Sequence, residues 1–239
     1  MTLSRRIAAE FAGSLVLTAV VIGSGIMGDN LAGGNVAIAL LANTLATGAI
    51  LFVLVHALGP ISGAHFNPAV TLVMTLQGAT KVSEAPLYIA LQIGGCIAGA
   101  MFAHALFGLP LIQQSAHVRA GAAQALSEGA ATFALIACIL LVSRTKPDAI
   151  PLAVALTIAA GYWWTPSTSF ANPAITIARA LSDTFAGIRP QDAPTFIAAQ
   201  CAGAVLAWAA CAWLYRLPFR AANAVSTAAA TRSVSNSGG

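Results

Sequence analysis

The sequence has little charge and no long polar segment. Only 8% of its 239 residues are Asp, Glu, Lys or Arg, and 58% are hydrophobic, whereas soluble domains carry about 25% charged residues. This composition excludes an ordinary soluble enzyme and leaves no charged block for binding nucleic acid. The four cysteines lie in apolar runs without a CxxC pair, and no His, Cys and Asp spacing fits a metal site. We therefore predict no metal and no cofactor.

Long apolar segments are what the sequence has instead. Six of them fall at residues 7–27, 35–58, 85–108, 122–143, 149–165 and 193–215, and a membrane span needs about 20 apolar residues. The sequence therefore predicts an all-α, multi-pass membrane protein. Eight of the 11 Lys and Arg residues fall on one side in this topology, so we expect both termini in the cytoplasm. We also expect the spans to lie in the inner (plasma) membrane.

The two halves of the chain resemble each other. The segment Ala85–Gln92, APLYIALQ, returns as Ala193–Gln200, APTFIAAQ. Three spans per half is an odd number, so the second half must lie inverted in the membrane, as in channels and transporters. We divide the chain into a first repeat at residues 1–115 and a second at 116–216. Residues 217–239, which lack an apolar period, are expected to form a disordered cytoplasmic tail.

Each half contains one Asn-Pro-Ala tripeptide. The two copies are Asn67, Pro68 and Ala69, and Asn172, Pro173 and Ala174. Asparagine favours the N-cap of a helix and proline its first turn. The apolar stretch after each tripeptide is too short to span the membrane, so both are expected to be re-entrant half-helices.

Opposed repeats would bring the two half-helix N-termini together near the middle of the membrane. Each N-terminus carries roughly half a positive charge, which repels cations. If the side-chain oxygens of Asn67 and Asn172 cap their own helices, we expect both NH₂ groups to be free to donate to a passing neutral molecule. The alternative is that each tripeptide only caps a buried turn, but two copies in an inverted repeat favour a pore.

Two carboxylates lie inside predicted spans, Glu10 and Glu128. Such residues are costly in a membrane and often functional, which would fit proton coupling in a transporter. Alternatively, each carboxylate accepts hydrogen bonds from the backbone of a re-entrant loop. Their equivalent positions, one before each loop, favour the second interpretation.

These motifs resemble the aquaporins of the major intrinsic protein family. The resemblance covers about residues 5–216 and rests on Ser62–Thr71, SGAHFNPAVT, and on Ala9-Glu10-Phe11. It implies six tilted helices plus two half-helices, a pore in every subunit and a homotetramer in the lipid bilayer. By the same resemblance, His65 is expected to line the cytoplasmic vestibule.

Aquaporins have a narrower filter beyond the paired asparagines. Carried over by distance from the motifs, its four positions are Thr47, Ala160 or Gly161, Ser169 and Ile175. Ile175 stands where the family usually has an arginine, and bulky or polar residues are also missing elsewhere. We therefore expect a wider and less polar aperture than in strictly water-selective members.

The chain also resembles the bacterial aquaporins associated with arsenic-resistance operons, with which it shares the run Ser182–Ile188, SDTFAGI. This resemblance implies passage of arsenite, As(OH)₃, alongside polyol-like solutes. Arg179 follows Ile175 by one helical turn. It is a candidate for a displaced cationic filter element, and the alternative is that it pairs with Asp183 at i+4.

The sequence thus predicts a passive channel, not an enzyme, for small uncharged solutes: polyol-like molecules, metalloid hydroxides and water, with ions and protons excluded. The alternatives are a proton-coupled secondary transporter and a membrane-junction protein with a vestigial pore.

Overall fold

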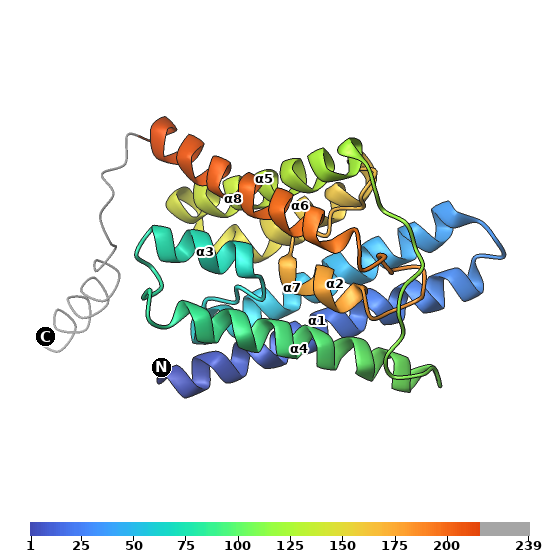
Figure 1. Ribbon diagram of the computed structural model, residues 1–239. Coiled ribbons are helices and arrows are strands. Elements are labelled where there is room, and N and C mark those ends of the chain that lie inside the picture. The colour runs from blue at the N-terminus through green and yellow to red at the C-terminus, as the bar shows by residue number, and fades with distance from the viewer. Residues whose placement is uncertain (216–239) are drawn as a thin grey trace, which may run out of the picture.

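The computed structural model describes residues 1–215, and this part of the chain is entirely helical apart from its connecting segments (Figure 1). The long helices are α1 (Leu3–Leu31), α2 (Val36–Ser62), α4 (Ala85–Leu106), α5 (Ala122–Thr145), α6 (Ile150–Trp164) and α8 (Ala193–Leu214). Two short helices are α3 (Pro68–Leu76) and α7 (Pro173–Arg179), and the single turn η1 (Pro147–Ala149) precedes α6. The all-α membrane fold is confirmed, and the predicted tail at 217–239 lies outside the described residues.

Five of these helices, α1, α2, α4, α5 and α8, are long and apolar enough to cross a membrane. The sixth predicted span corresponds to α6, whose 15 residues reach about 22 Å. This helix ends at Trp164 because the next residue, Thr165, precedes Pro166 and takes an extended conformation, with φ −120° and ψ 131°. The chain then continues as a non-helical segment toward α7.

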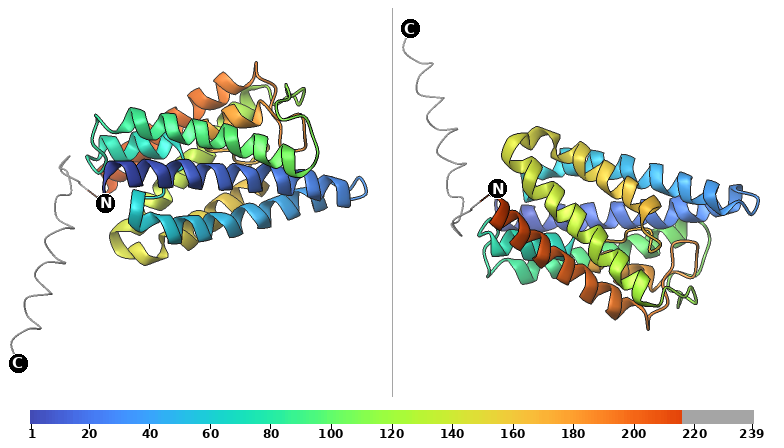
Figure 2. Two further views of the ribbon diagram at one scale, coloured as in Figure 1. Left: turned by 90° about the horizontal axis from the view of Figure 1, so that it is seen from below. Right: turned by 90° about the horizontal axis from the view of Figure 1, so that it is seen from above.

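Glycines let the helices of each half approach closely. Figure 2 shows α1 beside α4 and α5 beside α8. A Cβ at Gly95 or Gly99 of α4 would collide with the carbonyl oxygen of Phe11 or Leu15 in α1, and one at Gly203 of α8 with that of Gly129 in α5. Small residues therefore form the main packing contact in both halves.

The N-terminus and the end of α8 lie at the same end of the bundle (Figure 1). The segments 107–121 and 180–192 lie together at the other end, where the Ser115 amide donates to the Ala180 carbonyl at 3.2 Å. We call these two ends the terminal end and the far end.

Candidate functional site: a cavity between two half-helices

Both half-helices begin at the asparagines predicted to cap them. The Asn67 side-chain oxygen accepts from the Ala69 amide at 2.9 Å, and that of Asn172 accepts from the Ala174 amide at 3.0 Å. Pro68 and Pro173 occupy the first turn, where a missing N–H leaves no bond unmade. The two alanines have no exposed surface, so each helix start is tightly enclosed.

The asparagine side chains also tie the two half-helices to each other. Nδ2 of Asn67 donates to the Ala171 carbonyl at 2.7 Å, and Nδ2 of Asn172 donates to the Phe66 carbonyl at 2.8 Å. The expectation that both NH₂ groups are wholly free was therefore wrong. Each group has two N–H bonds and uses one for the opposite loop, so one donor per asparagine remains for a solute.

Glu10 holds the loop before α3. One oxygen accepts from the Ser62 hydroxyl at 2.6 Å and the His65 amide at 3.0 Å; the other accepts from the Phe66 amide and the Gln92 amide nitrogen, both at 2.7 Å. Phe66 has a φ of 48°, which is an unfavourable conformation for a bulky residue. Four hydrogen bonds on a fully buried carboxylate stabilise this loop.

Glu128 has the same arrangement in the second half. It accepts from the amides of Phe170 and Ala171, both at 2.9 Å, and from the Gln200 amide nitrogen at 2.6 Å. Ala171 again has a positive φ, 47°. Neither carboxylate lines the cavity described next, so both face the loops and not a path for solutes.

A cavity of about 340 Å³ passes the two asparagines and reaches toward both ends of the bundle. Its wall toward the terminal end includes Arg6, His65 and Gln77, which we call the terminal mouth. Its wall toward the far end includes Tyr162, Ser169, Phe170 and Arg179, which we call the far mouth. The volume lies within the range of small-molecule sites.

Three of the predicted filter residues, Thr47, Ser169 and Ile175, line this cavity. Ala160 does not, because its side chain is exposed on the outside of the bundle. Gly161 is buried and packs against Ser169, so it contributes no side chain to the wall. Placing Ala160 in the filter was therefore wrong, whereas a place for Gly161 beside Ser169 stays a prediction.

The helix α6 contributes a different residue at this level. Its cavity-lining residues are Ile150, Val154, Ile158 and Tyr162, which recur at the i+4 spacing of one helix face. The segment between Trp164 and Asn172 is not helical, so a distance from Asn172 does not determine which face of α6 a residue occupies. Each residue of error turns the side chain by about 100°, so the i+4 pattern was the signal that could have found this face.

Tyr162 and Arg179 change the expected character of the filter. The hydroxyls of Tyr162 and Thr47, two residues that line the cavity, lie 3.2 Å apart. The expectation of a less polar aperture relied on Thr, Ala and Ile alone, and it needs correction because an aromatic hydroxyl and a guanidinium also line the wall.

Arg179 is not paired with Asp183, so that alternative was wrong. Among the described residues its Nε donates to the Ala186 carbonyl, while Asp183 accepts from the Ala116 amide at 2.8 Å. The guanidinium carbon of Arg179 lies 3.3 Å from the ring centroid of Phe170, and only 2% of the residue is exposed. The side chain is thus fixed against the ring beside the cavity.

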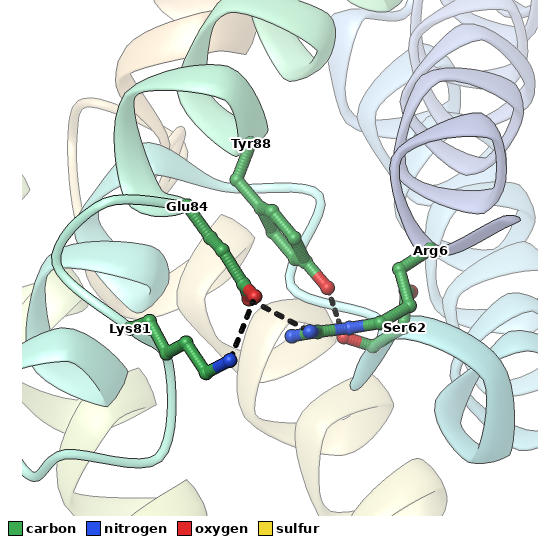
Figure 3. A network of polar contacts seen from close by, with 5 residues as sticks. All are labelled: Arg6, Ser62, Lys81, Glu84 and Tyr88. Carbon is green, nitrogen blue, oxygen red and sulfur yellow. Dashed lines mark hydrogen bonds and ion pairs between the residues drawn. The ribbon is translucent and has the colours of Figure 1, made fainter. Parts of the chain in front are cut away.

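A polar network at the terminal mouth was not foreseen from the sequence. Figure 3 shows Arg6 between Glu84 and Tyr88, with Nη1 of Arg6 2.7 Å from a Glu84 oxygen. Lys81 approaches the same carboxylate at 3.7 Å, and the Tyr88 hydroxyl donates to the Ser62 carbonyl at 3.0 Å. His65, the predicted vestibule residue, lines the cavity nearby with its Nδ1 3.0 Å from the Thr71 hydroxyl.

Nothing in residues 1–215 resembles a metal centre. No three His, Cys, Asp or Glu residues of this range cluster closely enough to hold an ion. All four cysteines have free thiols. The chemistry available at the site is therefore hydrogen bonding and electrostatics from the cavity wall.

The sequence is similar to that of known membrane channel proteins. A family model described as Major intrinsic protein matches residues 1–160. Aquaglyceroporin AqpS of Rhizobium meliloti (strain 1021) is 52% identical over 212 residues, which are 89% of this chain and 91% of that protein. Probable aquaporin PIP2-8 of Oryza sativa subsp. japonica is 36% identical over 107 residues, 45% of this chain and 38% of the relative.

Solved structures share the fold. The X-ray structure of the aquaglyceroporin from Plasmodium falciparum matches with a TM-score of 0.66 and 18% identity, covering 87% of this chain and 95% of that one. The family match, the long similarity to AqpS and the paired half-helices agree with one another. The chain therefore belongs to the major intrinsic protein family, whose members are passive channels for small solutes and not enzymes.

Proposed function

We propose that this protein conducts glycerol-like polyols, metalloid hydroxides such as arsenite, and water, and excludes ions and protons. The observation that carries the proposal is the reciprocal bonding of Asn67 and Asn172 on the wall of one continuous cavity. The name of the similar AqpS, an aquaglyceroporin, supports the choice of polyols as solutes.

The two half-helix N-termini favour neutral solutes. Helix dipoles place roughly half a positive charge at each N-terminus, and two such ends meeting in the cavity repel a cation. The remaining N–H of each asparagine can donate to a hydroxyl or water oxygen, which replaces part of the solute's hydration. Donors on both sides also turn a water molecule's oxygen toward the asparagines, which interrupts a hydrogen-bonded chain that could carry protons.

At the far mouth, we assign the solute filter to Thr47, Tyr162, Ser169, Ile175 and Arg179. Neither Nη nitrogen of Arg179 forms a hydrogen bond within residues 1–215, and the residue lines the cavity. The two Nη nitrogens can donate to a solute hydroxyl, while Ile175 and the Phe170 ring provide apolar contact for its carbon side. A wall with both characters can hold a compact polyol by its hydroxyls and by its carbon side.

Proton-coupled transport is not favoured. Coupling needs a carboxylate that titrates within reach of the transport path, whereas Glu10 and Glu128 face the loops and accept four and three hydrogen bonds. A junction protein with a vestigial pore is equally disfavoured, because the cavity runs past both asparagines.

We also propose the architecture of two inverted repeats, residues 1–115 and 116–216, in a homotetramer with both termini in the cytoplasm. The matched pairs α1 with α4 and α5 with α8 support the repeats. Strongly exposed apolar side chains, among them Leu45, Leu126, Leu156 and Leu206, support a surface that faces lipid or other subunits.

Stopped-flow light scattering on proteoliposomes tests the proposal. Water, glycerol, urea and arsenite fluxes are compared with empty liposomes, with and without a pH gradient. We expect fast entry of the neutral solutes at rates that the gradient does not alter. Entry that requires the proton gradient would overturn the channel and turn attention to Glu10 and Glu128.

A further inference from the structure

Two buried arginines, Arg179 in the far mouth and Arg119 behind it, form no ion pair with a carboxylate within residues 1–215. Arg119, from the segment before α5, is 8% exposed and Arg179 is 2% exposed. Their guanidinium carbons lie 5.0 Å and 3.3 Å from the ring centroid of Phe170. Because both distances are measured to the same point, the two guanidinium carbons cannot be farther apart than the two distances added together. Like charges sheltered from bulk water repel more strongly than exposed ones.

Within the described part of the chain, these two cations form their hydrogen bonds and ring contacts with uncharged groups. Arg119 donates from Nε to the Gly187 carbonyl at 2.8 Å and from Nη1 to the Ser167 carbonyl at 3.2 Å. Arg179 donates from Nε to the Ala186 carbonyl. Carbonyls, the Phe170 ring and the C-terminal end of α7 offset part of the charge, but none of them carries a full negative charge.

The acidic residues of this region are bonded elsewhere. Asp183 accepts from the Ala116 amide. Glu128 accepts from the loop before α7 and attracts both arginines from there, without a direct ion pair to either of them within residues 1–215. Asp192 accepts from the Arg189 side chain at 2.8 Å and from the Arg119 backbone amide at 2.9 Å. No ion pair within residues 1–215 includes the side chain of Arg119 or Arg179.

The terminal mouth is different, because its arginine is neutralised. Arg6 forms an ion pair with Glu84 at 2.7 Å (Figure 3). At the far mouth, by contrast, two arginines face one nearby carboxylate, Glu128, which forms no ion pair with them, so an excess of positive charge lies beside the cavity wall.

We propose that the far mouth binds a small inorganic oxyanion on the free Nη donors of Arg179, with Arg119 adding positive charge behind Phe170. The planar guanidinium fork matches two oxygens of such an anion. Because Arg179 lines the cavity, an anion held there blocks neutral solutes. The block rests on the proposed channel function, and it is one-sided because the anion reaches Arg179 from the far end.

The first test uses sulfate as the probe in proteoliposomes. Glycerol entry is measured with sulfate outside only or inside only, and gluconate, a bulkier anion, holds the ionic strength constant. A protease-removable tag at the N-terminus gives the fraction of channels in each orientation. We expect tens of millimolar sulfate to lower flux at least about twofold, and only through channels whose far end faces the sulfate.

Variants of matched charge test the assignment. Arg179→Gln should abolish the sulfate block, and Arg119→Gln should raise the half-inhibiting concentration several-fold. Arg189→Gln removes one positive charge from the same end, where Arg189 is already paired with Asp192, and should leave the block intact. Arg179→Lys keeps the charge without the fork and should bind sulfate more weakly, which provides a second variant if the glutamine variant does not fold.

Calorimetric titration of the purified protein with sulfate separates the possible failures. Saturable heat in the wild type that disappears in Arg179→Gln supports the site even if no solute flux is found, in which case the channel proposal falls alone. Normal glycerol flux with neither sulfate heat nor sulfate block overturns the anion site and leaves the channel intact. Equal block from both sides, or a block retained in Arg179→Gln, also overturns it.

Discussion

The substitution Glu10→Gln tests whether the buried carboxylate serves the loop before α3. The backbone amides of His65 and Phe66 donate to different oxygens of Glu10. A glutamine has one acceptor oxygen, so one of these amides must face an NH₂ group whichever way the side chain turns. A buried donor without a partner costs about 1–3 kcal/mol, and the remaining bonds lose their charge assistance.

Together these losses amount to about 3–5 kcal/mol, a large share of the stability of a typical domain. For a chain of this size about 2–4 °C of melting temperature corresponds to 1 kcal/mol, so we expect a fall of roughly 10 °C. The assay is thermal unfolding of the detergent-solubilised protein, followed by glycerol flux per reconstituted channel. We expect fewer intact channels and no new dependence on a pH gradient.

Glu84→Gln is the matched control, because Glu84 also loses a carboxylate charge but lies at the rim of the terminal mouth. Its ion pairs are with partly exposed cations, so the expected cost is about 1 kcal/mol or less. Equal melting temperatures for Glu10→Gln and Glu84→Gln would refute the loop-holding role. A Glu10→Gln protein that folds normally but conducts differently with a pH gradient would refute it as well.

Three further predictions concern the far mouth. Tyr162→Phe keeps the ring but removes the hydroxyl beside Thr47, so the ratio of glycerol to water permeability should change less than in Tyr162→Ala. Equal ratios in the wild type and both variants would exclude Tyr162 from the filter. Ile175→Arg adds bulk and charge and should lower glycerol flux about tenfold or more in stopped-flow assays, an effect of about 1.4 kcal/mol on the barrier, while water flux falls less. The hydrogen bond from Arg189 lowers the pKa of Asp192, so the ionised Asp192 should stabilise the fold above pH 3.8 and lose this effect as the pH falls further. When the pH is lowered, the melting temperature of Asp192→Asn should therefore fall less than that of the wild type.

Much of the fold was predictable because each part of it follows from a local rule. Apolar length gave the long helices, and Asn followed by Pro gave the starts of α3 and α7. The positions of Glu10 and Glu128 before each loop predicted their use, since a bent backbone inside a membrane needs hydrogen-bond partners. These inferences depend on nearby residues and survive small errors in position.

The filter was predicted less well because it depends on how separate segments meet. Ala160 is two residues before Tyr162, which lines the cavity, and two residues turn a helix side chain to the opposite face. The i+4 spacing of Arg179 and Asp183 suggested a pair, but α7 ends at Arg179, so Asp183 is not on the same helix. Arg119 was counted only as a charge on one side of the membrane, since its contact with Phe170 requires the folded far end.

The reciprocal asparagine bonds impose an order on assembly. Asn67 reaches a carbonyl of the second half and Asn172 reaches one of the first, so neither asparagine can form its bond to the opposite loop during synthesis until the segment after α6 has been made. A ribosome-bound chain truncated before α7 therefore holds α3 with an unsatisfied amide and an open loop. We therefore expect the contact between the two half-helices to form late in synthesis, and co-expressed half-chains to form it only when they associate.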